Sequence, residues 1–486
     1  MKKLLFILAI CFNPAFIFSQ TGFRSFIARV NSLKDNPQAQ TAVVDSFMNY
    51  AKTKGIPFVE GSTANFLYRG TASGVSVAGD FNDWNGAVNI LTKLSNTDLY
   101  YFSRSFEENA RLDYKFVLNG SNWILDPLNP HQVAGGYGMN SELAMPGYVQ
   151  PWEIQFKSLV KHGKVESRSV YSVKTSSAYQ LKIYLPPGYN SENAEEYPSV
   201  YFQDGLDYIN LGSSVNVIDN LLDSGKIVPL IAVFVQPNDR NVEYTGNKRV
   251  QYTDFFCHEL VQFIDSLYKT IRISKDRLVL GDSYGGNISA LIAFNHPELF
   301  GNCALHSGAF QPNNYEAASL ISSKPLEPIK LFSVWGSYEG LYQFWRPFKD
   351  SLMQKGYELK WAEYPEGHSW GLWRATLDDM LKYFYPAQGT PVESRSLRSS
   401  GFSLAQNYPN PFNPSTTISF TIPAAGRYAL RIYNIMGREV ALLSEGEFSE
   451  GAHRLNFNAR DLPSGVYVYR LEGKNVFIAR KMALLK

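Results

Sequence analysis

The stretch RLVLGDSYGGNISALIAF, residues 277–294, runs from a short apolar segment through a glycine-rich turn into an apolar run typical of a helix. Its first four residues predict a buried strand. Gly281 and Gly285 flank Ser283 in a G-x-S-x-G pattern, and a sharp turn from strand to helix needs small residues at those places. Such a turn presents the serine hydroxyl at the carboxyl end of the strand. Ser283 is therefore the candidate nucleophile, and an ordinary glycine-rich turn is the alternative.

Three histidines between Ser283 and residue 387 are candidates for its base. His296 comes at the end of the helix that starts at the serine, so we expect it to point away from the turn. His306 ends the next apolar segment and can line a pocket. His368 lies in a loop after the strand predicted over 359–364. Because sites built on such a turn take serine, acid and histidine in that chain order, His368 is the candidate base. A histidine in a surface loop is the alternative.

The acid should follow the strand that precedes the histidine loop. Glu339 is the only carboxylate in the segment 336–340, which comes directly after the strand predicted there. Its role would be to hold the imidazole in one tautomer and to stabilise the imidazolium. Asp350 lies deeper in the next helix, and Glu366 is too close to His368 in sequence to be the usual partner.

An oxyanion hole needs two backbone N–H donors. One is the amide after the nucleophile, that of Tyr284. The other should come from a loop after an early strand, and 198–202 is such a strand, followed by Gln-Asp-Gly-Leu. Gly205 permits a tight turn there, so the amide of Leu206 is the candidate second donor. The alternative is that Asp204 and Gly205 form a simple turn.

Composition limits what the remaining chain can be. The 486 residues include 46 Lys and Arg against 44 Asp and Glu, for a net charge of +2. This balance excludes a nucleic-acid binder that works through a strongly basic face. Charged residues are 19% and aromatic residues 14% of the chain, which is too apolar for a disordered protein. The length indicates about three domains.

The pattern changes along the chain divide it into segments. Alternating strand-like and helix-like stretches indicate a parallel α/β sheet, and period-two alternation indicates all-β regions. We expect a signal peptide over 1–20, a helical segment over 21–55, an all-β domain over 56–150, an α/β domain over 151–386, a linker over 387–402 and a second all-β domain over 403–486.

The first twenty residues have the pattern of a cleaved secretory signal. Lys2 and Lys3 precede the apolar run 4–12, which is too short to span a membrane. An N-terminal anchor is the alternative, and no later stretch reaches about 18 apolar residues. The only later cysteines, Cys257 and Cys303, read as core residues, since no Cys-x-x-Cys or spaced His/Cys cluster suggests a metal site.

Residues from about 178 to 386 resemble the esterase family that includes enterochelin (siderophore) esterases, esterase D and the feruloyl and acetylxylan esterases of carbohydrate esterase family 1. The resemblance lies in LKIYLPPGY at 181–189, YFQDG at 201–205, the 281–286 turn, NHPELF at 295–300 and GHSW at 367–370. It implies an α/β-hydrolase fold and serine ester hydrolysis through an acyl-enzyme, without metal or cofactor.

The same resemblance suggests residues of a substrate pocket. Arg240, with Glu243 and Tyr244, matches a segment near the site in the siderophore-esterase branch, although a structural role is the alternative. Asp204 and Trp370 lie within the matched motifs YFQDG and GHSW and complete the candidate pocket. The acid departs from the family pattern, because feruloyl esterases commonly have Asp where this chain has Glu339.

The upstream β-rich stretch resembles a second family. VSVAGDFNDW at 75–84, YKFVLNG at 114–120 and WILDP at 123–127 are similar to the glycogen-binding module of AMP-activated kinase β subunits and to early-set domains of branching enzymes. The resemblance implies that Trp84 and Trp123 stack on sugar rings, that Lys115 bonds hydroxyls, and, with a weaker match, that Asn140 makes a further contact. The alternative is that the module only supports the catalytic domain and its tryptophans are packing residues.

The C-terminal stretch resembles the sorting domain of type IX secretion, which is close in shape to an immunoglobulin-like domain. The ordered motifs are QNYPNPFNPSTTI at 406–418, YNIMGREV at 433–440 and LPSGVYV at 462–468. The resemblance implies translocation across the outer membrane by the type IX machinery and a secreted or cell-surface location, with a plain structural sandwich as the alternative.

The sequence thus predicts an α/β-hydrolase domain between two immunoglobulin-like β-sandwiches. The leading interpretation is a secreted serine esterase, similar to feruloyl and acetylxylan esterases, acting on an ester attached to, or derived from, a polysaccharide or plant-derived glycan. The alternatives are a siderophore or other non-glycan esterase, an acyltransferase of the mycolyltransferase type, and a glycan-binding surface protein with a degenerate site. Five of eight tryptophans fall within 335–373, which suggests either an aromatic wall at the ester site or core packing.

Overall fold

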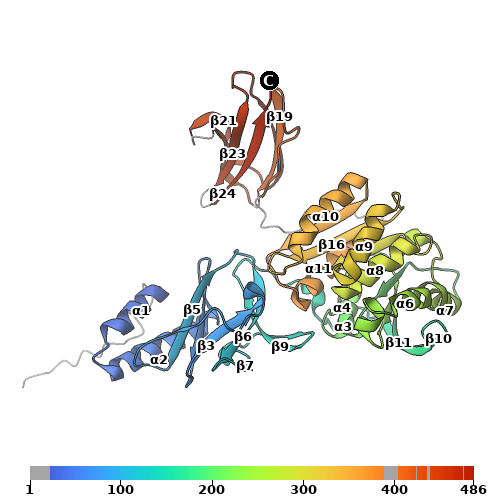
Figure 1. The fold of residues 1–486 in the computed structure, drawn as a ribbon, viewed down its shortest axis with the longest axis horizontal. Helices are drawn as coiled ribbons and strands as arrows, with labels where there is room; N and C mark the ends of the chain where they lie inside the picture. The colour runs from blue at the N-terminus through green and yellow to red at the C-terminus, as the bar shows by residue number, and fades with distance from the viewer. Residues whose placement is uncertain (1–21, 388–402, 423, 435–437, 474–475) are drawn as a thin grey trace, which may run out of the picture. The chain divides into compact units, whose positions relative to one another are not determined.

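The computed structural model describes residues 22–387, 403–422, 424–434, 438–473 and 476–486. The chain forms two compact units, Met1–Glu393 and Ser394–Lys486, shown in Figure 1. The predicted signal peptide, and all but the first residue of the predicted linker 387–402, lie outside the described residues. Among the described residues, no helix is both long and apolar enough to cross a membrane.

Two helices begin the first unit, α1 (Phe23–Ser32) and α2 (Pro37–Lys54). Pro37 separates them, and it also starts α2, because proline suits the first turn of a helix. The Asn36 side chain caps this helix by accepting from the Ala39 amide at 3.1 Å. The rings of Phe26 and Phe47 stack 3.9 Å apart and join the two helices to each other.

The next region consists of two sheets that share one core. Strands β1–β2–β5–β4 form one sheet, and β3–β6–β9–β8, with β7 on β6, form the other. The strands are β1 (Phe58–Glu60), β2 (Thr63–Arg69), β3 (Val75–Gly79), β4 (Thr92–Lys93), β5 (Leu99–Ser105), β6 (Arg111–Leu118), β7 (Asn122–Ile124), β8 (Gln132–Gly135) and β9 (Gly138–Ala144). We call this region the N-terminal sandwich.

Strand β6 shows how the alternating sequence builds this sandwich. Leu112, Tyr114 and Phe116 belong to the buried core between the sheets. Because successive residues of a strand point to opposite faces, Arg111 and Asp113 lie on the other face of the sheet. On that outer face, the buried Arg111 contacts the α/β domain.

An eight-stranded sheet forms the α/β domain, in the order β10–β11–β13–β12–β14–β15–β16–β17. In this order, the strands from β13 to β17, including β12, are parallel to one another. The pairs β10–β11 and β11–β13 are antiparallel. The strands are β10 (Lys164–Ser172), β11 (Ser177–Leu185), β12 (Ser199–Phe202), β13 (Ile231–Val235), β14 (Arg277–Asp282), β15 (Asn302–His306), β16 (Lys330–Gly336) and β17 (Leu359–Tyr364).

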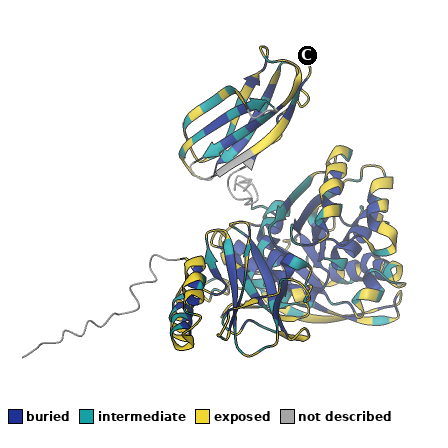
Figure 2. Cartoon of the chain, turned by 60° about the vertical axis from the view of Figure 1, so that its left-hand side comes forward, coloured by how far each residue is buried: buried dark blue, intermediate teal, exposed yellow. Residues whose placement is uncertain are grey.

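Helices cover this sheet, as Figures 1 and 2 show, and their buried sides face the strands. They are α3 (Gly205–Asn210), α4 (Ser214–Asp223), α5 (Arg240–Tyr244), α6 (Arg249–Phe255), α7 (Val261–Leu267), α8 (Tyr284–Asn295), α9 (Pro312–Ser323), α10 (Tyr342–Lys355) and α11 (Trp370–Phe384). A π-helical turn joins α6 to α7 and contains Cys257, which is buried and free, like Cys303 in β15.

The second unit is again built from two sheets around one core. Strands β18–β19–β22 form one sheet and β21–β20–β23–β24 the other. The strands are β18 (Ser403–Leu404), β19 (Ser415–Ile422), β20 (Gly426–Asn434), β21 (Glu439–Phe448), β22 (Gly451–Asn458), β23 (Gly465–Gly473) and β24 (Val476–Leu484). Ile418, Leu430 and Tyr469 are among the fully buried residues of its core.

Candidate active site

The turn that carries Ser283 has a strained backbone that its glycines make possible. Ser283 follows β14 directly and precedes α8, with φ 51° and ψ −117°. A positive φ is rare for a residue with a side chain, and such strain is found mainly at functional sites. A Cβ on Gly281 would lie 2.3 Å from the carbonyl carbon of Gly285, so the close approach of these two residues requires glycine.

Glu339 and His368 lie on neighbouring loops at the carboxyl ends of β16 and β17. His368 Nδ1 and Glu339 Oε2 form a short hydrogen bond, and the other carboxylate oxygen accepts from the Gly336 amide at 2.7 Å. Glu339 is 5% exposed, whereas the side chain of His368 is 37% exposed. A buried carboxylate therefore holds an imidazole whose other nitrogen is free to serve a substrate.

The charge around His368 favours its protonated form. Desolvation lowers the pKa of His368, but the Glu339 carboxylate outweighs this effect, and the pKa is raised above the ordinary value of 6.5. Asp282 adds to the increase, so the histidine lies close enough to the residue before Ser283 to feel its charge. The described residues include no hydrogen bond to the Ser283 hydroxyl, and such bonds often tighten only when substrate is bound.

The structure places the rings of the other two histidines, His306 and His296, away from the site of Ser283, Glu339 and His368. His306 is fully buried, and its Nδ1 lies 3.0 Å from the Tyr208 hydroxyl. Burial lowers the pKa of His306 to about 3, so it stays neutral. The expectation that it lines the pocket is therefore wrong: its backbone carbonyl supports the turn by accepting from the Ser283 amide at 2.9 Å, while its ring belongs to the core.

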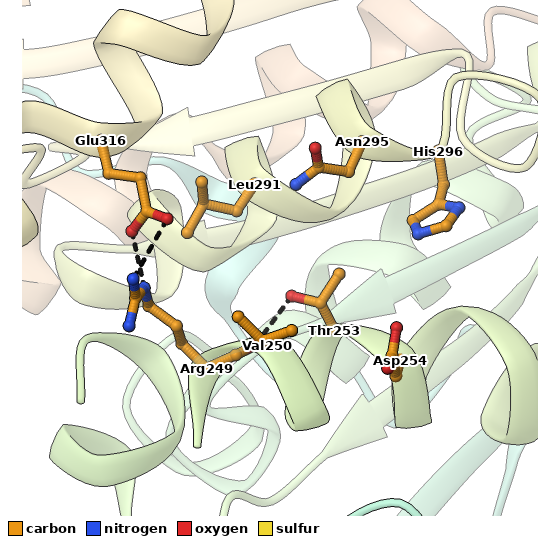
Figure 3. Close-up of a pocket in the computed structure, with 8 residues that line it drawn as sticks. All are labelled: Arg249, Val250, Thr253, Asp254, Leu291, Asn295, His296 and Glu316. Carbon is orange, nitrogen blue, oxygen red and sulfur yellow. Dashed lines mark hydrogen bonds and ion pairs between the residues drawn. The ribbon is translucent and has the colours of Figure 1, made fainter. Parts of the chain in front are cut away.

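His296 lies at the far end of α8, as expected. The helix has 12 residues, so its ends are about 18 Å apart. His296 lines a separate pocket of about 360 Å³ between α6, α8 and α9, shown in Figure 3. Two ion pairs lie at that pocket: Arg249 pairs with Glu316 at 2.6 Å, and His296 pairs with Glu298 at 3.0 Å.

A compact ionic cluster of Arg240, Asp204 and Asp282 contacts the turn that carries Ser283. Arg240 Nε donates to both carboxylate oxygens of Asp204 at 2.9 Å, and its Nη2 donates to the Asp282 carbonyl at 3.0 Å. Burial raises the pKa of Asp204 to about 8 and that of Asp282 to about 6. Asp204 is buried and Arg240 is 33% exposed at its side chain, so of the two only Arg240 offers surface to a substrate.

The two candidate oxyanion donors lie at the starts of helices. Tyr284 is the first residue of α8, and the first amides of a helix have no partner within it. Leu206 is the second residue of the short helix α3, and its amide makes only a long contact, 3.4 Å, to Gln236 Oε1. Gly205 is required at that turn, because a Cβ there would lie 2.4 Å from the Phe234 carbonyl carbon.

Most of the clustered tryptophans are packing residues. Trp335 and Trp345 are fully buried, and their rings stack 5.6 Å apart. Trp370 is 4% exposed and meets Tyr208 edge-on, so in this structure it offers almost no surface to a substrate. Trp373 packs edge-on against the His368 imidazole, with ring centroids 5.1 Å apart. The expected aromatic wall is largely core.

The four candidate glycan-binding residues are in different surroundings. Trp123 is 45% exposed on β7, and Lys115 is half-buried on the outer face of β6. Trp84 is half-buried, and its indole N–H donates to Asp80 Oδ1 at 3.0 Å. Asn140 Nδ2 donates to Asp113 Oδ2 at 3.0 Å. Trp123 and Lys115 are thus the accessible pair, while Trp84 and Asn140 already serve internal hydrogen bonds.

Sequence reasoning did not single out Asp282 as part of this site, and it included Trp373 only as one of the five tryptophans at 335–373. Asp282 occupies the variable place before Ser283 in the G-x-S-x-G pattern, so its position alone could have marked it. Trp373 lies in the first turn of α11, shortly after His368 in sequence, but its donation to Ser307 Oγ at 3.0 Å depends on a distant segment. Among the described residues, no group of three or more His, Cys, Asp or Glu side chains is arranged to hold a metal ion.

Comparisons with known proteins match two parts of this chain to known families. Residues 172–384 match the family model described as "Putative esterase". Residues 406–484 match the model described as "Secretion system C-terminal sorting domain". The first match spans β11 to α11 and so contains Ser283, Glu339 and His368.

Two curated relatives each align with less than half of the chain. The uncharacterised protein YjcH of Bacillus subtilis is 27% identical over 238 residues, which are 46% of this chain and 98% of the relative. An endo-1,4-β-xylanase/feruloyl esterase of Xylanibacter ruminicola is 25% identical over 206 residues, 40% of this chain and 28% of that protein.

A solved structure extends the likeness beyond the matched family segment. The enterobactin esterase of Shigella flexneri is 19% identical, with a TM-score of 0.56, and the alignment covers 66% of this chain and 92% of that one. This likeness shows a shared fold, with an α/β-hydrolase-like domain, over more of the chain than residues 172–384. Residues 172–384 therefore belong to the esterase family, and the chain is a carboxylic-ester hydrolase that carries a secretion-system sorting domain at residues 406–484.

Proposed function

We propose that Ser283, His368 and Glu339 form the catalytic triad of this esterase. The observation that carries the proposal is the hydrogen bond between His368 Nδ1 and the buried Glu339 carboxylate, on loops that end strands of the sheet whose strand β14 leads into Ser283. Bonding of Nδ1 to an acid leaves Nε2 unprotonated in the neutral ring, as a general base requires.

The reaction then runs in two halves. Ser283 Oγ attacks the ester carbonyl carbon while His368 Nε2 takes the hydroxyl proton. The amides of Tyr284 and Leu206 stabilise the oxyanion, and His368 returns the proton to the leaving alcohol as the C–O bond breaks. Water deprotonated by His368 attacks the acyl-enzyme, which releases the acid and regenerates Ser283. The roles of Leu206 and Tyr284 follow from their places at helix starts.

The substrate we propose is an ester on a polysaccharide or on a plant-derived glycan. Two observations support it: one relative bears the name endo-1,4-β-xylanase/feruloyl esterase, and Trp123 and Lys115 are accessible on the outer face of the N-terminal sandwich. Flat sugar faces pack on indole rings, and their hydroxyls need polar partners. The second candidate is a siderophore ester, favoured by the shared fold with the enterobactin esterase.

Residues 406–484 support a secreted or cell-surface location, reached by way of the type IX secretion machinery. With the signal peptide predicted over 1–20, the chain would cross the inner membrane first and be sorted from the periplasm. Removal of the sorting domain after export would leave the esterase and the N-terminal sandwich, which form one compact unit.

The test is a panel of acetyl, feruloyl and longer acyl esters, free and attached to xylan, offered to the wild type and to Ser283→Ala. We expect Ser283→Ala to keep its fold and to lose hydrolysis of every ester. Full residual activity of that variant would remove the triad assignment. Preference for enterobactin over every glycan ester would select the siderophore alternative instead.

A further inference from the structure

The N-terminal sandwich contacts both loops that carry the proposed acid and base. Tyr338, the neighbour of Glu339, packs against the core of the sandwich and donates its hydroxyl to Glu107 Oε2 at 2.6 Å. On the other loop, the backbones of Arg111 and Glu366 form an isolated parallel β-bridge. The loops also hold each other, since the Tyr338 amide donates to the Glu366 carbonyl at 3.0 Å.

Arg111 contacts the histidine loop on both sides of His368. Its backbone amide donates to the Pro365 carbonyl at 3.2 Å, and its Nη1 donates to Ser369 Oγ at 3.3 Å. The guanidinium is completely buried and is balanced by Asp113 at 2.8 Å and by Glu142 at 2.7 Å. A buried, neutralised guanidinium is fixed in place, so the loop is fixed by it.

Asp80 supports the residue between those two contacts. A Cβ on Gly367 would lie 2.0 Å from Asp80 Cγ, so the loop backbone lies directly on this carboxylate. Asp80 is itself held, because it accepts from the Asp113 amide at 2.7 Å and from the Trp84 indole at 3.0 Å. The residue before His368 must be glycine for the loop to approach the sandwich so closely.

We propose that Arg111 and Asp80 are positioning residues of the esterase, which hold the His368 loop of one domain from the surface of another. This inference rests on the proposed role of His368 as the base. The N-terminal sandwich then forms part of the catalytic machinery whether or not it binds sugar. A displacement of about 1 Å in a catalytic group can cost about 100-fold in rate, which sets the size of the expected effect.

The first test is a double-mutant cycle with Gly367→Ala and Asp80→Ala. Gly367→Ala should lower kcat for a short p-nitrophenyl ester by about 100-fold and change KM by less than about threefold, because the added methyl pushes the loop off Asp80. Asp80→Ala should cost about tenfold. The double variant should be no worse than Asp80→Ala alone, since the smaller side chain leaves room for the methyl. Multiplied losses in the double variant would overturn the proposed contact.

The second test separates positioning from stability. Arg111→Gln should lower kcat by 10- to 100-fold and move the acid limb of kcat/KM to lower pH, because a displaced His368 loses the carboxylate that raises its pKa. Arg111→Lys, which keeps the charge, should restore part of kcat. Arg277→Gln is the matched control: Arg277 is also buried and paired, with Asp265 at 2.9 Å, but it lies at the opposite end of β14 from Ser283.

Unchanged kcat and an unchanged pH profile in folded Arg111→Gln would overturn the inference, as would the same losses in Arg277→Gln. If Arg111→Gln does not fold, the cycle of Gly367→Ala and Asp80→Ala provides the reading, because it probes the same loop without changing Arg111. Ser283→Ala keeps the two proposals apart: an active Ser283→Ala removes the proposed function, whereas an inactive Ser283→Ala beside fully active positioning variants removes only this inference.

Discussion

The two all-β regions of this chain share an architecture but relate differently to the esterase domain. The N-terminal sandwich and the esterase domain lie in one compact unit. The buried Arg111 and Asp80 of the sandwich contact the loop of His368. The C-terminal sandwich forms a unit of its own, with a separate core. A β-sandwich beside a catalytic domain can therefore be a component of the active site or a separable module, and the buried contacts distinguish the two cases.

The strongest way to break this comparison is to remove residues 22–150. We expect esterase activity to fall below detection, because the loops of Glu339 and His368 lose their support and the buried Glu366 becomes exposed. Hydrolysis of a short ester by the soluble truncated protein measures it. Activity within tenfold of the wild type would show that the N-terminal sandwich is as separable as the C-terminal one.

The next largest effect concerns stability. Arg111→Ala should lower the free energy of unfolding by about 3–5 kcal/mol, because it leaves the buried Asp113 and Glu142 without their cation. Arg431 in the C-terminal unit also meets three carboxylates, but on an exposed surface, so Arg431→Ala should change unfolding little. Denaturant titration followed by tryptophan fluorescence measures Arg111→Ala. For Arg431→Ala it is followed by far-UV circular dichroism, because all eight tryptophans lie in the first unit. A larger loss for Arg431→Ala would contradict the account.

The pH dependence should belong to the first unit alone. His368 must be neutral to act as a base, and Glu339 raises its pKa above 6.5. We therefore expect kcat/KM to fall about tenfold per pH unit once the pH is below the pKa of His368. Glu339→Gln should move this limb to lower pH while lowering kcat. A pH–rate profile of both proteins measures the effect, and an acid limb that stays in place in Glu339→Gln would contradict the assignment of the acid.

The smallest effect is expected from the C-terminal unit. Removal of residues 403–486 should leave kcat and KM for a soluble ester within about twofold of the wild type, and should leave the pH profile unchanged. Secretion, in contrast, should fail, because this segment matches the sorting domain. Steady-state kinetics of the purified protein and the amount of protein exported measure the two readouts. A large loss of activity would show that the two units are coupled.

The sequence predicted those features that depend on neighbouring residues. The Ser283 turn is a local pattern of glycines between a strand and a helix, and its backbone strain follows from that pattern. Glu339 and His368 could be selected because the ends of parallel strands meet at one edge of a sheet.

The features that the sequence did not predict join distant segments. Arg111 and Ser369 are 258 positions apart, so no spacing rule connects them. His306 ends a strand beside the nucleophile, yet its ring points into the core, because which face of a strand is buried depends on the packed helices. The tryptophans at 335–373 are close in sequence to the proposed triad, but Trp335 and Trp345 fill the core.

The most direct test of the proposed triad is the intact mass of the protein after reaction with a fluorophosphonate. The account predicts one adduct, located on Ser283 by peptide mapping, absent from Ser283→Ala, and formed much more slowly in His368→Ala, because only an activated serine reacts readily. Equal labelling of Ser283→Ala and the wild type, or labelling of wild-type Ser283 at a rate indifferent to His368→Ala, would contradict it.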